Sequence, residues 1–223
     1  MNLLDLNVVW DYWPVFLKGL MMTVMLTAIV IVIAGIAAIP IALARMSKSR
    51  WIRWPADFYV EFVRATPLIL QLIYMYYVLP SAGIRLNPIG AAIIGLSVNY
   101  SAYMSEVYRS GIQAVSREQV EAATALGLKW FIVFRKIVLP QAFRIVVPAL
   151  GNYFIALFKD TALASVVTVQ ELMFSGQIIA ARNYQYLTVY TVTAILYFAV
   201  GYPSALLVRR LEAWSRRGWG TAN

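Results

Sequence analysis

The chain has 223 residues, of which 61% are hydrophobic and only 13% are charged, and its mean hydropathy is +0.70. Soluble domains carry about 25% charged residues, so the composition excludes a water-soluble globule and indicates an integral membrane protein. We expect one all-α membrane domain over residues 1–223, because the long uncharged runs can span a bilayer as helices. Cysteine and histidine are absent, which excludes disulfide frameworks, the usual zinc sites and nucleophilic relays built on either residue. We therefore expect no catalytic residue, no metal and no cofactor in the chain.

Five long segments with little charge are the candidate membrane spans, at about 17–44, 58–80, 88–106, 147–169 and 185–208. Each can cross a hydrocarbon layer about 30 Å thick as a helix. The segments that alternate to one side hold 15 of the 19 basic residues, and those on the other side hold 3. This asymmetry predicts the N-terminus outside and the C-terminus in the cytoplasm, and it explains the net charge of +9 by topology and membrane lipid without nucleic acid.

Local features add detail to the first, second and fourth spans. In the first span Ala34, Ala38 and Ala42 recur every four residues, which predicts close packing against another helix. Pro40 in the first span and Pro67 in the second are expected to kink their helices. In the fourth span we expect Pro148 to lie in the first helical turn.

A long cytoplasmic loop, 110–143, joins the third and fourth spans. Its centre is rich in helix formers and is expected to form a short helix that stops at Gly127. Ala122, Ala125 and Leu126 would then form a small apolar ridge on one face. Such a ridge suits insertion into a groove on another protein, but a helix packed under its own bundle has the same pattern, and periodicity does not choose between them.

The loop carries a motif that gives the chain a family resemblance. The residues Glu121, Ala122, Ala123, Gly127, Ile137, Leu139 and Pro140 stand at the spacing of the EAA signature of ABC importer membrane subunits. The chain as a whole resembles a five-helix, type I permease of the polar amino-acid uptake branch. The resemblance also covers the stretches that begin at Arg64, Glu106, Pro140 and Lys159.

This resemblance implies a set of partners and a location. The EAA residues would form coupling helices that dock on a cytoplasmic ABC ATPase dimer, which binds the ATP and Mg²⁺. A second permease chain, identical or related, would pair with this one in the membrane. A periplasmic or lipid-tethered binding protein would deliver the substrate, and the chain would be a multi-pass protein of the bacterial inner membrane. The pattern G-x-x-x-x-G-K-[ST] is absent, in agreement with ATP binding elsewhere.

Charged residues within the expected spans are the first candidates for substrate contact, because each is costly in lipid. Asp160 could take the ammonium group of an amino acid and Lys159 its carboxylate. The alternative is structural, with a charge paired to a neighbouring helix, for example Lys159 to Glu106. Together with the family resemblance, the polar residues nearby give these candidate substrate-binding residues: Gln71, Asn99, Tyr103, Glu106, Lys159, Asp160, Thr161 and Ser165.

We interpret the chain as the permease subunit of an ATP-driven importer for a polar amino acid, working by alternating access and not itself an enzyme. A compatible solute such as ectoine, or an opine, is the alternative substrate. A stand-alone secondary carrier fits less well, because such a carrier predicts an internal repeat that we do not find. A membrane-embedded enzyme would have only Glu106 and Asp160 as candidate carboxylates near the membrane, with no motif around them.

Overall fold

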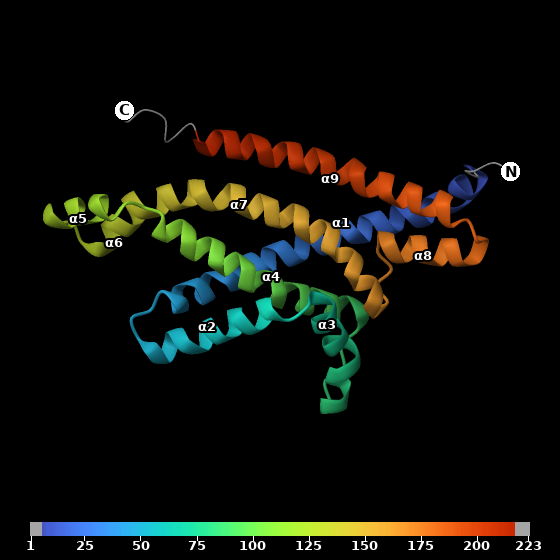
Figure 1. Ribbon diagram of the computed structural model, residues 1–223, viewed down its shortest axis with the longest axis horizontal. Helices are drawn as coiled ribbons and strands as arrows, with labels where there is room; N and C mark the ends of the chain where they lie inside the picture. The colour runs from blue at the N-terminus through green and yellow to red at the C-terminus, as the bar shows by residue number, and fades with distance from the viewer. Residues whose placement is uncertain (1–5, 217–223) are drawn as a thin grey trace.

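The computed structural model describes residues 6–216, and within them every regular element is a helix (Figure 1). The α-helices are α1 (Leu6–Arg45), α2 (Arg50–Ala65), α3 (Leu68–Ile73), α4 (Pro88–Gln113), α5 (Arg117–Ala125), α6 (Trp130–Val133), α7 (Leu139–Asp160), α8 (Leu172–Asn183) and α9 (Tyr186–Arg216). Two π-helical turns, η1 (Tyr74–Val78) and η3 (Phe134–Val138), and two 3₁₀ segments, η2 (Leu79–Ala82) and η4 (Thr161–Val167), join some of them.

The bundle is built around α1, which runs along α4 and also contacts α8 and α7. Ala34 and Ala38 are fully buried and Ala42 is 2% exposed, so the predicted packing face of this helix is confirmed. Their small side chains let helix backbones approach closely, which is how membrane helices gain van der Waals contact. Leu96 and Met104 of α4 belong to the same buried cluster as Ala34 and Ala38.

The apolar character of the helices agrees with a membrane location. Among residues 6–216, α1 and α9 are long and apolar enough to cross a bilayer, and α2 with the segment 68–82 makes a third candidate if the bent pair is one span. Helices α4 and α7 have 26 and 22 residues, but polar residues such as Asn99 and Asn152 lower their hydropathy. The first turn of α1 and the last turns of α9 lie toward opposite ends of the bundle (Figure 1).

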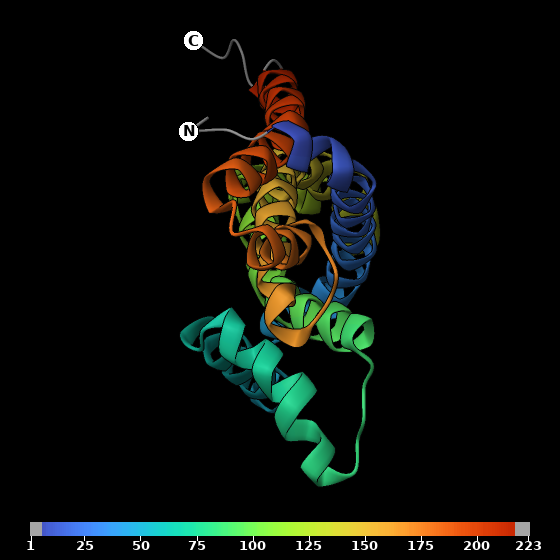
Figure 2. The ribbon, with the colours of Figure 1, turned by 90° about the vertical axis from the view of Figure 1, so that its right-hand side faces the viewer.

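The expected second span is broken in its middle. Helix α2 ends at Ala65, Thr66 and Pro67 are extended, and the chain resumes at Leu68 with a change of direction of 103°. A residue before proline is driven out of the helical region, which is the physical cause of the break. The kink expected at Pro67 is thus confirmed. In Figure 2 the segment from α3 through η2 projects away from the bundle.

The fourth expected span differs from the prediction at both ends. Its helix, α7, begins at Leu139, so the expectation that Pro148 lies in the first turn is wrong, and Pro148 is buried inside the helix. Pro140 occupies the helix start instead, where its missing N–H costs nothing. After Asp160 the chain tightens into the 3₁₀ segment η4, and Thr168, which follows it, has a left-handed φ of 64°.

Candidate functional site

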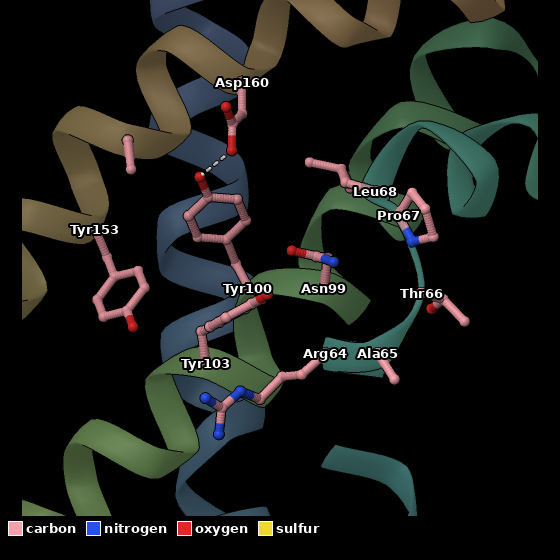
Figure 3. Close-up of a pocket in the computed structure, with 11 residues that line it drawn as sticks. Arg64, Ala65, Thr66, Pro67, Leu68, Asn99, Tyr100, Tyr103, Tyr153 and Asp160 are labelled. Atoms are coloured by element: carbon pink, nitrogen blue, oxygen red, sulfur yellow. Dashed lines mark hydrogen bonds between the residues drawn. The ribbon is translucent and has the colours of Figure 1, made fainter. Parts of the chain in front are cut away.

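A cavity of about 510 Å³ lies beside the break between α2 and α3 (Figure 3). Three segments that are far apart in the sequence line it: the α2–α3 break, the middle of α4 and the last turns of α7. The lining residues are Arg64, Ala65, Thr66, Pro67, Leu68, Asn99, Tyr100, Tyr103, Tyr153, Ala156 and Asp160. The chain bends by 103° at this break, and both α2 and α3 contact α4.

Asp160 supplies the negative charge of this cavity. It is the last residue of α7, and the Tyr100 hydroxyl donates a hydrogen bond of 2.7 Å to its carboxylate (Figure 3). Within residues 6–216 no cation lies within ion-pair distance of Asp160. One lone pair of the carboxylate is therefore satisfied, and the rest of its charge is available to a ligand.

Arg64 supplies the positive charge. Its guanidinium carbon lies 5.4 Å from the centroid of the Tyr103 ring, which is a cation–π contact. In the described part of the chain it forms no ion pair with a carboxylate. Figure 3 shows Arg64 and Asp160 at opposite ends of the cavity wall, with Tyr100 and Tyr103 between them. Arg64 is exposed and Asp160 is half-buried, and they are the two charged residues of the lining, of opposite sign and without an ion-pair partner in residues 6–216.

Aromatic rings form the wall between the two charges. The Tyr153 ring lies 6.3 Å from the Tyr100 ring, edge to face, and 6.1 Å from the Tyr103 ring. Rings packed against one another lose few rotamers when a ligand arrives, so the wall is largely pre-formed.

The structure separates the predicted substrate residues into three groups. Asn99, Tyr103 and Asp160 line the cavity. Gln71 does not line it but accepts a hydrogen bond from the Asn99 side chain, at 3.1 Å. The remaining four, Glu106, Lys159, Thr161 and Ser165, are not among the lining residues.

Two of these four have clear alternative positions. Glu106 forms ion pairs with Arg45 and Arg109, and Arg45 also binds Asp57 at 2.8 Å, which ties α1, α2 and α4 together. The alternative pairing of Lys159 with Glu106 is therefore wrong. The Lys159 side chain is exposed and makes no ion pair within residues 6–216, because the helical rotation that turns Asp160 to the cavity turns its neighbour away.

Thr161 is buried and donates a hydrogen bond of 2.7 Å to the Phe158 carbonyl oxygen, so its hydroxyl serves the turn after α7. Ser165 lies in η4 and is half-buried.

Sequence reasoning missed three residues of the site: Arg64, Tyr100 and Tyr153. Arg64 had a usable signal, since it stands just before a helix break that frees the end of α2 to face a neighbouring helix. The two tyrosines had none, because each packs against a residue of another helix, and 52 residues separate them in the sequence.

A further buried charge, Glu171, was also missed. It is fully buried and caps α8, where its carboxylate accepts hydrogen bonds from the Met173 and Phe174 N–H groups at 2.9 and 2.7 Å. The Tyr197 hydroxyl of α9 donates to it at 2.9 Å, and the Thr23 hydroxyl of α1 lies 3.4 Å away. Three helices therefore meet at one carboxylate, away from the cavity.

The EAA residues form the end of the bundle opposite α8 (Figure 1). Helix α5 stops as expected: Gly127 has a φ of +75°, and its N–H donates to the Thr124 carbonyl oxygen at 2.9 Å. Ala122, Ala125 and Leu126 are exposed, and Leu126 is 81% exposed. The ridge is therefore not packed under its own bundle, which removes the alternative that periodicity left open.

The other residues of the motif hold this end together or border it. Ala123 is buried, Glu121 is exposed, and Ile137, Leu139 and Pro140 lie at the junction of η3 and α7. Beside them a groove of about 1010 Å³ is lined mainly by apolar side chains, with Arg117 and Glu121 as its charged members. Within residues 6–216 no group of three or more Asp or Glu side chains could hold a metal ion.

Comparison with known proteins agrees with this architecture. A family model described as "Binding-protein-dependent transport system inner membrane component" matches residues 31–217. The probable amino-acid ABC transporter permease protein YckA of Bacillus subtilis is 36% identical over 216 residues, covering 92% of this chain and 96% of the relative. The L-cystine transport system permease protein TcyB of the same organism is 38% identical over 209 residues, covering 91% and 89%.

A solved structure is similar over nearly the whole chain. It is described as an amino acid ABC transporter with histidines, and it has a TM-score of 0.90 and 35% sequence identity. The match covers 94% of this chain and 98% of the other.

Proposed function

The chain belongs to the family of inner membrane components of binding-protein-dependent transport systems, and on this basis we propose that it is the permease subunit of an ATP-driven ABC importer for a polar amino acid. It is a membrane component, and the ATPase is a separate chain. Its place is the bacterial inner membrane. The observation that carries the substrate class is the cavity with one unpaired charge of each sign, Arg64 and Asp160.

The two charges would hold the two ends of a zwitterion. Arg64 is suited to the α-carboxylate, because a guanidinium presents a planar fork of donors that matches a carboxylate. Asp160 is suited to the α-ammonium, with Tyr100 holding the carboxylate in place. The aromatic wall would contact the side chain of the substrate. In this proposal Arg64 takes the role that sequence reasoning gave to Lys159.

The exposed ridge on α5 is the surface we assign to the ATPase. A small apolar ridge with a charged neighbour, Glu121, fits insertion into a cleft of a partner protein. The binding protein would meet the opposite end of the bundle, near α8. This arrangement requires the expected topology of five spans with the N-terminus outside, and a second permease chain, identical or related, beside this one.

Alternating access would use the break at Pro67 and the 3₁₀ segment η4. Both border the cavity residues, and neither carries regular α-helical hydrogen bonding, so each can change direction at lower cost than a continuous helix. ATP-driven closure of the partner would move α5, and the motion would reach the cavity through α4 and α7, which flank the coupling loop.

Reconstitution tests this proposal. The permease with its ATPase in lipid nanodiscs would be screened by thermal shift against the twenty amino acids, ectoine and nopaline. We expect stabilisation by a polar amino acid, lost in Arg64→Met and in Asp160→Asn. Stabilisation by ectoine or nopaline alone would replace the amino acid by that solute. ATP-dependent uptake by the permease without its ATPase would refute the proposed mechanism.

A further inference from the structure

Gln71 does not line the cavity, but it lies in α3 next to the α2–α3 break and is hydrogen-bonded to the lining residue Asn99. Its side-chain nitrogen is 2.8 Å from the Val63 carbonyl oxygen, 3.2 Å from the Thr66 carbonyl oxygen and 2.7 Å from the Thr66 hydroxyl. The last carbonyl groups of α2 have no partners within the helix, because the chain breaks at Pro67. The Gln71 amide therefore replaces the hydrogen bonds that the missing turn would have made.

These acceptors determine which way the Gln71 amide faces. Only its NH₂ group can donate, so the nitrogen must point to the α2 carbonyls and the oxygen must point away from them. That oxygen lies 3.1 Å from the side-chain nitrogen of Asn99. A reversed Gln71 amide would place its oxygen against carbonyl oxygens, which is repulsive.

The same argument applies to Asn99. Its NH₂ group must face the Gln71 oxygen, since a reversed Asn99 would bring two amide oxygens together. Asn99 is 5% exposed, and its carbonyl oxygen accepts no hydrogen bond from residues 6–216. Figure 3 shows the nitrogen end of Asn99 turned toward Thr66 and its oxygen end turned toward Tyr100 and Tyr103. The cavity wall thus presents an acceptor and not a donor.

We propose that Gln71 is a positioning residue that sets the polarity of this wall: it holds the Asn99 carbonyl oxygen toward the cavity, where it accepts a hydrogen bond from the ammonium end of the substrate. The inference rests on the proposed function. Asn99 then favours a ligand with a hydrogen-bond donor at its α-position. This preference depends on the α2 carbonyl groups at the Pro67 break, because they fix Gln71, which in turn fixes Asn99.

This role makes Gln71 a determinant of selectivity rather than of folding alone. In Gln71→Leu the oxygen that holds Asn99 is absent, so Asn99 can reverse and offer its NH₂ group to the cavity. Binding of an amino acid should weaken, whereas binding of the 2-hydroxy acid with the same side chain should change little, because a hydroxyl can also accept.

The experiment compares L-arginine and L-glutamine, each with its 2-hydroxy analogue, by calorimetry on the permease–ATPase complex in nanodiscs. We expect Gln71→Leu to lower the preference for the amino acid about tenfold, which corresponds to one hydrogen bond to a charged group. Gln141→Leu is the matched control, because the Gln141 amide binds Gln119 outside the cavity, and it should leave the preference unchanged.

A second measurement needs no ligand. In a double-mutant cycle of thermal unfolding, Gln71→Leu combined with Asn99→Leu should cost no more stability than the larger single change, because either change alone breaks the contact. Additive losses, or equal weakening of the amino acid and its 2-hydroxy analogue in Gln71→Leu, would overturn the proposal. A non-additive cycle in a complex that binds neither amino acid would refute the proposed function while supporting the Gln71–Asn99 contact.

Discussion

Replacing Gly127 by valine tests the coupling role of α5, because the cost of the change is purely conformational. Gly127 has a φ of +75°, a region in which an L side chain costs about 1–2 kcal/mol. A Cβ atom at this position would meet no heavy atom within 4 Å, so no collision adds to that cost. The strain falls on a turn held by Gly127 N–H to Thr124 and by Leu128 N–H to Ala123, at 2.9 and 3.2 Å.

A penalty of this size would open the turn without unfolding the membrane helices. Helix α5 would lose its fixed direction relative to α6, and the ridge at Ala122 would no longer match its partner. We expect Gly127→Val to lower substrate-stimulated ATP hydrolysis by about 5- to 30-fold, the factor that corresponds to 1–2 kcal/mol. Gly127→Asn should retain more activity, because asparagine tolerates the left-handed region.

The chain contains a matched control for this experiment. Gly83 has a φ of +86°, and a Cβ atom there also meets nothing within 4 Å, but it follows η2 and lies away from α5. Gly83→Val therefore carries similar strain without touching the coupling surface. ATPase activity and uptake would be measured for the whole transporter in lipid, with and without loaded binding protein. Full stimulated activity in Gly127→Val, or an equal loss in Gly83→Val, would refute the reasoning.

Three further substitutions test the cavity and the buried charges. Asp160→Asn should raise the KM for the amino acid about 10- to 100-fold in uptake assays, because the ammonium group loses a charged acceptor. The hydrogen bond from Tyr100 can persist in this variant. An unchanged KM would exclude Asp160 from substrate contact. Glu171→Ala should cost about 3 kcal/mol in unfolding experiments, since it removes a helix cap and leaves the Tyr197 hydroxyl buried without its acceptor, whereas Glu171→Gln should cost less. Arg45→Met should destabilise the junction of α1, α2 and α4 by about 1 kcal/mol, because the Glu106 and Asp57 carboxylates that it pairs with are partly exposed and Glu106 keeps Arg109. A stability equal to wild type would show that these ion pairs contribute nothing.

The class of the protein could be read from the amino acids alone. Low charge and high hydropathy place the chain in a bilayer, because a soluble surface cannot be built from 13% charged residues. The alanine ridge of α1, the break at Pro67 and the stop at Gly127 were all predicted, since each depends on side chains within one turn of the chain. The EAA spacing is local in the same sense, and it indicated the family.

The composition of the cavity could not be read in this way. Arg64, Asn99 and Asp160 lie on three helices, and only the packing of those helices places them around one cavity. Charge within an expected span made Asp160 and Lys159 equally good candidates for substrate contact. The rotation of α7, set by packing against its neighbours, turns Asp160 and not Lys159 toward the cavity. The orientation of the Asn99 amide, with its oxygen toward the cavity, depends in turn on Gln71. The orientation of Gln71 is set by the α2 carbonyl groups that lack helical partners because α2 stops before Pro67.

Local sequence therefore determined the class, the family resemblance and the turns of this protein, whereas the exposure of the ridge on α5 came only from the tertiary structure. The tertiary structure decided which charges face the cavity and which are paired elsewhere. The physical reason is that helix periodicity and turn chemistry act over a few residues, whereas the partner of a buried polar group is set by which helices cross and at what rotation.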